Sequence, residues 1–200
     1  MPAPFLRRLA AARDPRLRMQ ALEWIVPAVA QLAASPSEAF EVILELAEDE
    51  DATLRARALR MLGEGWLQRL PPGRERERER VIAAGLVGAE GTGSEGTGEG
   101  SEGAEPSPRD PAFDRAAALA VVRAAIATAA ALGRRDELLA LVADRARLGP
   151  ARAEALDALG PLARDQDLDV VLALAREDPL RLLPAARRFL LAAHRHGVFL

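Results

Sequence analysis

The amino-acid sequence predicts an all-α protein, a right-handed α-solenoid of about five helix pairs. One pattern recurs five times: an acidic or turn residue, Ala seven positions later, and apolar residues eight and eleven positions later. The copies begin at Asp14, Asp51, Asp110, Leu148 and Asp178, and three of the four intervals are 37, 38 and 30 residues. Such intervals have the length of two helices, and units of this size stack side by side.

The composition agrees with a helical core. Half of the residues are hydrophobic, but only 4% are aromatic and none is Tyr. The core must therefore consist of Ala, Leu and Val, and Ala and Leu favour helix over strand. No segment alternates polar and β-branched residues, so we expect almost no β-strand.

Each repeat is expected to contain a first helix, A, and a second helix, B, which carries the recurring pattern. The second A helix shows the helical period clearly, with Phe40, Ile43, Leu44 and Ala47 at positions i, i+3, i+4 and i+7. The expected A helices are 5–12, 38–48, 74–87, 136–148 and 168–177. The expected B helices are 15–34, 52–70, 111–132, 151–163 and 179–196.

Residues with known capping preferences mark the helix boundaries. Three B helices start with Asp followed by Pro. The Asp carboxylate accepts hydrogen bonds from free N–H groups, and Pro has no N–H to leave unpaired. These starts are 14–15, 110–111 and 178–179, whereas Gly73, Gly133 and Gly149 are expected to end helices. Pro27 lies inside a B helix and is expected to kink it.

The longest interval contains an insertion. Between Asp51 and Asp110 there are 59 positions, including 88–109, a run of mostly Gly, Glu, Ser and Thr. Because it has almost nothing to bury, we expect this segment to be disordered. Without its 22 residues the interval is 37, so the segment interrupts the third helix pair and residues 1–200 form one domain. We hypothesise that the insertion is a tether or a steric gate.

Three segments resemble HEAT-like repeats, in particular the short bacterial kind first associated with phycobilisome lyases: 14–22 (DPRLRMQAL), 51–59 (DATLRARAL) and 150–156 (PARAEAL). The Trp, Gly and Tyr pattern of tetratricopeptide repeats is absent. The resemblance implies that the B helices line a concave surface, and that Arg18, Arg55 and Arg152 form a ladder to inter-helix Asp residues and carbonyl groups. A row that binds phosphate or carboxylate is the alternative.

Composition argues against several functions. The net charge of −3 does not suit a general nucleic-acid or anionic-membrane binder, which carries a basic excess. All 27 basic residues are Arg, a bias typical of GC-rich bacterial genomes, and there is no Cys to form disulfides or thiolate metal sites. His194 and His196 are two positions apart on a helix and cannot share a metal ion. We therefore expect no metal, no cofactor and no enzymatic activity.

A cytoplasmic location is expected. Residues 1–18 lack the apolar segment of a secretory signal. The most apolar stretch, 116–132, is 17 residues long and contains Arg123. It is at the short limit for crossing a bilayer, so we interpret it as a buried helix.

The candidate partner-binding residues lie opposite the core positions of the B helices or are the two tryptophans. They are Glu23, Trp24, Arg57, Arg60, Glu64, Trp66, Arg123, Glu154, Asp157 and Arg187. The eight charged positions divide equally between Arg and carboxylates, a balance suited to a protein partner. An exposed Trp would anchor that partner, and a buried one would fill gaps between helices. The preferred function is a non-enzymatic protein-interaction scaffold or adaptor.

Other functions stay open at this point. A nucleic-acid-binding solenoid, similar to the HEAT-like alkylpurine glycosylases, would use concave Arg and Trp side chains. A lyase or chaperone for a bilin-type chromophore is suggested by the family resemblance alone. The apolar end 197–200 is consistent with a fragment of a longer solenoid or with self-association through this end.

Overall fold

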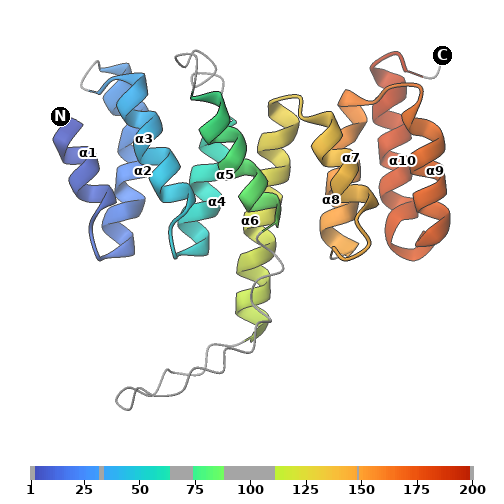
Figure 1. Cartoon of the computed structure of the whole chain (residues 1–200), viewed down its shortest axis with the longest axis horizontal. Coiled ribbons are helices and arrows are strands. Elements are labelled where there is room, and N and C mark those ends of the chain that lie inside the picture. The colour runs from blue at the N-terminus through green and yellow to red at the C-terminus, as the bar shows by residue number, and fades with distance from the viewer. Residues whose placement is uncertain (1–2, 32–33, 64–73, 88–110, 148, 199–200) are drawn as a thin grey trace.

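The computed structural model describes residues 3–31, 34–63, 74–87, 111–147 and 149–198. Within these ranges it contains ten α-helices, a short 3-10 helix and no β-strand, which confirms the all-α prediction (Figure 1). The helices are α1 (Ala3–Ala10), α2 (Pro15–Ala30), α3 (Pro36–Ala47), α4 (Ala52–Leu62), α5 (Glu75–Val87), α6 (Pro111–Ala131), α7 (Arg135–Ala143), α8 (Gly149–Leu159), α9 (Asp167–Glu177) and α10 (Pro179–Arg195). The 3-10 helix η3 (Gly160–Leu162) follows α8. None of the described helices is long and apolar enough to cross a membrane.

The ten helices pack in adjacent pairs, from α1 with α2 to α9 with α10. The even-numbered helices also contact one another in sequence: α2 with α4, α4 with α6, α6 with α8, and α8 with α10. We call these five helices the even row. Figure 1 shows α1 and α2 at one end of the molecule and α9 and α10 at the other. Helix pairing is thus confirmed.

The recurring sequence pattern supplies the core of the even row. In α2, Ala21, Leu22 and Ile25 are at most 1% exposed, and the corresponding residues of α4, α8 and α10 are also buried. Full burial of a Leu, Ile or Phe side chain stabilises the fold by about 1.5–3 kcal/mol. In α6, Ala117 and Ala118 are only half-buried. Figure 1 gives the reason, because the first turns of α6 extend beyond the neighbouring helices.

The predicted cap at Asp14 is confirmed, and Asp51 caps α4 in the same way although no cap was predicted there. The Asp14 carboxylate accepts a hydrogen bond from Arg16 N at 2.9 Å, and Asp51 accepts from Thr53 N at 2.7 Å. Ser35 and Glu38 form a capping box that the sequence analysis missed. Asp178 was predicted to cap α10, but its side chain makes no capping hydrogen bond, because its backbone (φ −134°, ψ 71°) differs from that of Asp14 and Asp51. Asp110 lies outside the described residues.

Several predicted helix ends are wrong. The second helix ends at Ala30 instead of 34, and α4 ends at Leu62 with Gly63 as its C-cap. The predicted helix 136–148 ends at Ala143, because the Asp144 carboxylate accepts from Ala146 N at 3.0 Å and starts a turn.

The glycines at predicted helix ends have different outcomes. Gly133, with φ +69°, follows α6 as expected. Gly149 begins α8 and does not end a helix, so that prediction is wrong. Gly73 and the insertion 88–109 lie outside the described residues. α2 runs through Pro27 to Ala30.

Candidate functional site

The predicted ladder arginines, Arg18, Arg55 and Arg152, all donate hydrogen bonds to backbone carbonyl groups at the end of the preceding helix or just after it. Arg18 Nη1 donates to the carbonyl oxygens of Ala12 at 3.1 Å and Arg13 at 3.0 Å, and Arg18 Nη2 donates to Asp49 Oδ1 at 2.9 Å. The hydrogen bond to Asp49 raises the pKa of Arg18, although burial acts in the opposite direction. This guanidinium ties the turn after α1 to the turn after α3.

Arg55 and Arg152 bond carbonyl groups within their own helix pairs. Arg55 Nη1 donates to the carbonyl oxygens of Asp49 at 2.5 Å and Glu50 at 2.9 Å, and Arg152 Nε donates to Val142 O at 2.8 Å. Leu182, which replaces Arg in the last repeat, is fully buried in the core. The carbonyl contacts of the ladder interpretation are confirmed for all three arginines, whereas the contact with an inter-helix Asp is confirmed for Arg18 alone.

A second buried ion pair was not predicted. Arg135 at the start of α7 donates through Nε to Asp167 Oδ2 at 3.0 Å and through Nη2 to Asp167 Oδ1. The side chains are 9% and 1% exposed. Asp167 also accepts from Arg164 N at 2.8 Å. The pair fixes the start of α9 against α7. The hydrogen bonds that Arg135 donates to Asp167 raise the pKa of Arg135.

The candidate site residues that the structure describes all lie on the even row. Glu23 and Trp24 belong to α2, Arg57 and Arg60 to α4, Arg123 to α6, Glu154 and Asp157 to α8, and Arg187 to α10. None belongs to the buried core, and Trp24 is 45% exposed. Glu64 and Trp66 lie outside the described residues.

The even row brings part of this set together as ion pairs between helices. Arg123 Nε of α6 lies 2.7 Å from Glu154 Oε1 of α8. Asp157 of α8 accepts three hydrogen bonds from Arg188 of α10, two from Nε at 2.9 and 3.0 Å and one from Nη2 at 2.7 Å. These bonds raise the pKa of Arg188. Sequence reasoning selected Arg187 and missed Arg188, because the choice depends on how α10 is rotated against α8.

Exposed apolar side chains are concentrated at the two ends of the molecule. The large ones in the described residues are Leu17, Trp24 and Val26 of α2, Val170 of α9, and Leu180, Leu183 and Leu191 of α10. Leu180 is 93% exposed, Leu183 57% and Leu191 52%. The spacing of Leu180, Leu183, Arg187 and Leu191 (i, i+3, i+7 and i+11) places them on one face of α10. This second stripe, opposite the core stripe, was the signal that sequence reasoning overlooked.

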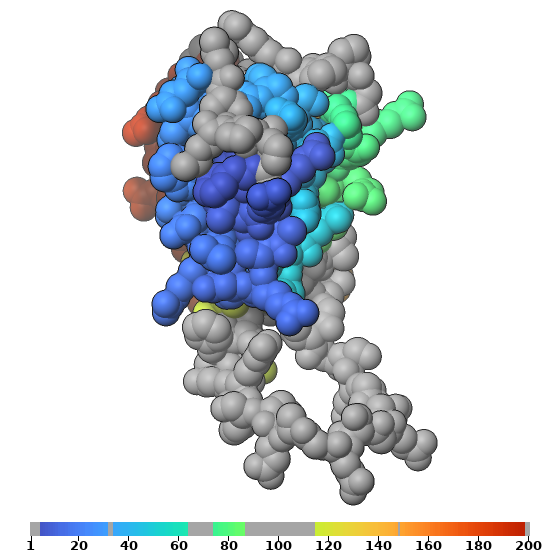
Figure 2. All heavy atoms as spheres, turned by 90° about the vertical axis from the view of Figure 1, so that its left-hand side faces the viewer, coloured from blue at the N-terminus to red at the C-terminus, as the bar shows by residue number. Residues whose placement is uncertain are grey.

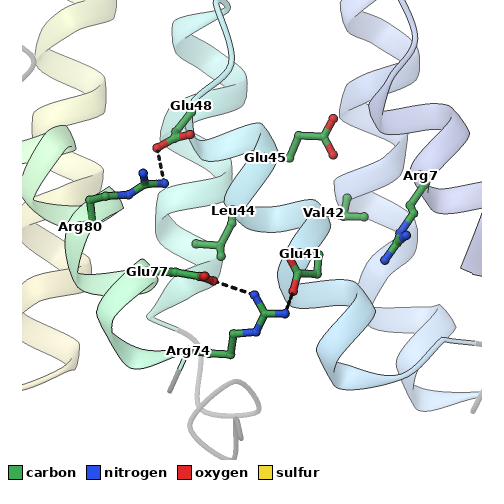
Figure 3. Close-up of a pocket in the computed structure, with 9 residues that line it drawn as sticks. All are labelled: Arg7, Glu41, Val42, Leu44, Glu45, Glu48, Arg74, Glu77 and Arg80. Carbon is green, nitrogen blue, oxygen red and sulfur yellow. Dashed lines mark hydrogen bonds and ion pairs between the residues drawn. The ribbon is translucent and has the colours of Figure 1, made fainter. Parts of the chain in front are cut away.

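The opposite side of the molecule has a charged groove between α1, α3 and α5 (Figure 3). Its volume is about 480 Å³, and its walls include Val42, Leu44 and seven charged side chains. Arg74 bridges Glu41 and Glu77, and Arg80 Nη2 lies 3.2 Å from Glu48 Oε1. Because most of its charges neutralise one another, the groove offers little field for an ionic ligand.

The described residues contain no cluster of three or more His, Asp or Glu side chains that could hold a metal ion. Fold and surface together define an all-helical protein of paired helices with a long mixed-charge surface on its even row. Comparisons with protein-family models, curated proteins and solved structures find no significant match to this chain.

Proposed function

We propose that this chain is a non-enzymatic scaffold or adaptor, a HEAT-like α-solenoid that binds another protein along its even row. The observation that carries the proposal is the alternation of charge across α6, α8 and α10, formed by the Arg123–Glu154 and Arg188–Asp157 pairs. These pairs are partly exposed, with side-chain exposures of 51% and 34% in the first and 58% and 33% in the second. The arginine side chain of each pair, Arg123 or Arg188, is more than half exposed and remains accessible to a partner.

The alternation favours a protein over a nucleic acid. A groove for the phosphate backbone needs basic side chains that are free to neutralise successive phosphates. Here two of the basic side chains on the surface are already bonded to carboxylates. A protein partner can instead match charges of both signs, which fixes its register and excludes other partners.

The solenoid assignment is supported by the packing of the even row. Each even helix contacts the next one, and Arg18 of α2 also links the first helix pair to Asp49 in the turn of the second pair. Units that contact only their neighbours form an extended surface, and solenoid proteins bind partners with such surfaces.

The experiment is an affinity capture from lysate of the source organism, with and without nuclease, using the whole chain. We compare Arg57→Glu/Arg60→Glu, which reverses two exposed charges of α4, with Arg8→Glu/Arg76→Glu, the same charge change on α1 and α5. The proposal expects a stoichiometric protein that survives nuclease treatment, is recovered at least tenfold less with the α4 variant, and is unaffected by the control.

Two results would overturn the proposal. One is nucleic acid in the eluate together with loss of all captured proteins after nuclease treatment, which indicates the nucleic-acid-binding alternative. The other is equal loss of the partner with both double variants, which shows that overall charge, and not the even row, determines binding.

A further inference from the structure

We propose that copies of this chain associate head to tail, with α10 of one copy packing against α2 of the next. The contact repeats the internal packing of α8 against α10. In it, α10 takes the place of α8, and α2 of the next copy takes the place of α10. This interface is independent of the proposed scaffold function, since it needs no other protein.

The internal contact between α8 and α10 defines the register. Gly149, Asp157 and Gly160 stand one, nine and twelve positions after Leu148, where the fourth repeat begins. A Cβ placed on Gly149 would lie 2.6 Å from Arg181 Cδ, and one on Gly160 would lie 2.7 Å from Ala192 Cβ. Between these two contacts, Asp157 accepts hydrogen bonds from Arg188. The partner residues Arg181, Arg188 and Ala192 stand three, ten and fourteen positions after Asp178.

The positions that α8 uses for this contact, one, nine and twelve residues after the start of the repeat, face away from α8 when they are counted on α10. One, nine and twelve positions after Asp178 stand Pro179, Arg187 and Leu190, and Leu183 lies between them on the same side. α10 forms one end of the molecule in Figure 1, and Leu183 on this side is 57% exposed. Pro179 and Arg187 are exposed, and Leu190 is partly buried.

The receiving positions at the other end of the molecule are on α2. Three, ten and fourteen positions after Asp14 stand Leu17, Trp24 and Ala28. Leu17 is 39% exposed and Trp24 45%, whereas Ala28 is buried. Figure 2 shows this end, where α1 and α2 form the outer surface. The two surfaces therefore continue the even row: the contacts α2–α4, α4–α6, α6–α8 and α8–α10 would be followed by α10–α2 of the next copy.

The paired positions are chemically complementary. Where Asp157 meets Arg188 inside the chain, Arg187 would meet Trp24, a guanidinium over an indole ring, which is a favourable cation–π contact. Leu17 and Leu183 would lose exposed apolar surface. Pro179 and Leu190 are larger than Gly149 and Gly160, so the two helices would be farther apart, which leaves room for the indole.

Symmetric alternatives are less favourable. Two α10 helices facing each other through the outer side would bring the Arg187 side chains of both copies together, and like charges repel at short distance. Terminal pairs of stacked helices normally present a polar outer surface. Here the exposed large apolar residues of the described chain lie only on α2, α9 and α10. A head-to-tail contact does not close on itself, so it predicts open chains that lengthen with concentration.

The test is sedimentation velocity of the purified 200-residue chain. The chain concentration is varied between about 1 and 200 μM, so that an interface with a dissociation constant in this range changes from mostly dissociated to mostly associated. The expected result is a weight-average mass that rises with concentration above the monomer mass of 21.4 kDa. Leu183→Glu blocks the α10 surface and Trp24→Glu blocks the α2 surface, and each is expected to weaken association at least tenfold. Arg76→Glu, at an exposed position of α5, is the control and leaves association unchanged.

Mixing the two blocked variants identifies the head-to-tail arrangement. Each variant retains one intact end, so an equimolar mixture is expected to form a dimer and nothing larger. A mass of one monomer at every concentration overturns the proposal. So does association that survives either variant alone, which indicates a symmetric contact, or a mixture that does not dimerise.

Discussion

Removal of the Asp167 carboxylate should strongly destabilise the second half of the molecule. Asp167 is 1% exposed and accepts hydrogen bonds from Arg135 Nε, Arg135 Nη2 and Arg164 N. In Asp167→Ala all three donors lose this acceptor, and the Arg135 guanidinium stays buried without its main counter-charge. Breaking a buried ion pair by removing one partner costs about 3–5 kcal/mol, and we expect a loss within this range.

Two companion variants separate charge from hydrogen bonding. Asp167→Asn keeps an acceptor oxygen but removes the charge, so we expect a smaller loss of about 1.5–3 kcal/mol. Arg135→Met/Asp167→Leu replaces both partners with apolar side chains, and such replacements are often nearly neutral. Asp169→Ala is the control, because Asp169 is exposed in the same first turn of α9 and should contribute no more than about 1 kcal/mol.

The assay is urea unfolding followed by circular dichroism, together with amide hydrogen exchange in α7 and α9. Hydrogen exchange is needed because stacked helix pairs can open locally before the whole chain unfolds. In Asp167→Ala, exchange should become faster first at the starts of α7 and α9. A loss below about 1 kcal/mol, or equal losses in Asp167→Ala and Asp169→Ala, would refute the argument that this buried pair holds α7 and α9 together.

Two further predictions concern helix starts. Asp51→Ala removes the acceptor for Thr53 N and Leu54 N and should cost about 1 kcal/mol in urea unfolding, whereas Asp51→Asn should cost much less. The hydrogen bonds from Ser35 lower the pKa of Glu38, so its stabilising effect is present above the ordinary carboxyl pKa and is lost as pH falls through the lowered value. The unfolding midpoint of Glu38→Gln should therefore approach that of the wild type as the pH is lowered below about 4, and a pH-independent difference would contradict this.

The helix pairs were predictable because their signals are local and repeated. Ala21, Leu22 and Ile25 occupy one face of a helix by spacing alone, and all three are buried. The ladder arginines could also be placed, since each stands at one repeat position. Similar side chains at the same spacing in several repeats constrain the packing more than any single segment does.

Helix ends and surface pairs could not be predicted in the same way, because they depend on neighbouring helices. Asp178 has the same Asp-Pro sequence as Asp14, yet its side chain does not cap α10. Arg187 and Arg188 are adjacent in sequence, and only the rotation of α10 against α8 decides that Arg188 meets Asp157. The buried pair of Arg135 and Asp167 joins residues 32 positions apart, and no local pattern marks it.

Gly160 shows how a residue that looks like a loop signal has a packing role. It precedes Pro161 and begins η3, but a Cβ at this position would lie 2.7 Å from Ala192 Cβ. Carbon atoms pack at about 3.5–4.0 Å, so Gly160→Ala must push α10 away from α8 and should cost about 1–3 kcal/mol. Ala192→Gly removes the opposing methyl group. Gly160→Ala should therefore be less costly in that background, and an equal cost in both backgrounds by urea unfolding would show that the close approach of α8 and α10 is not what requires glycine.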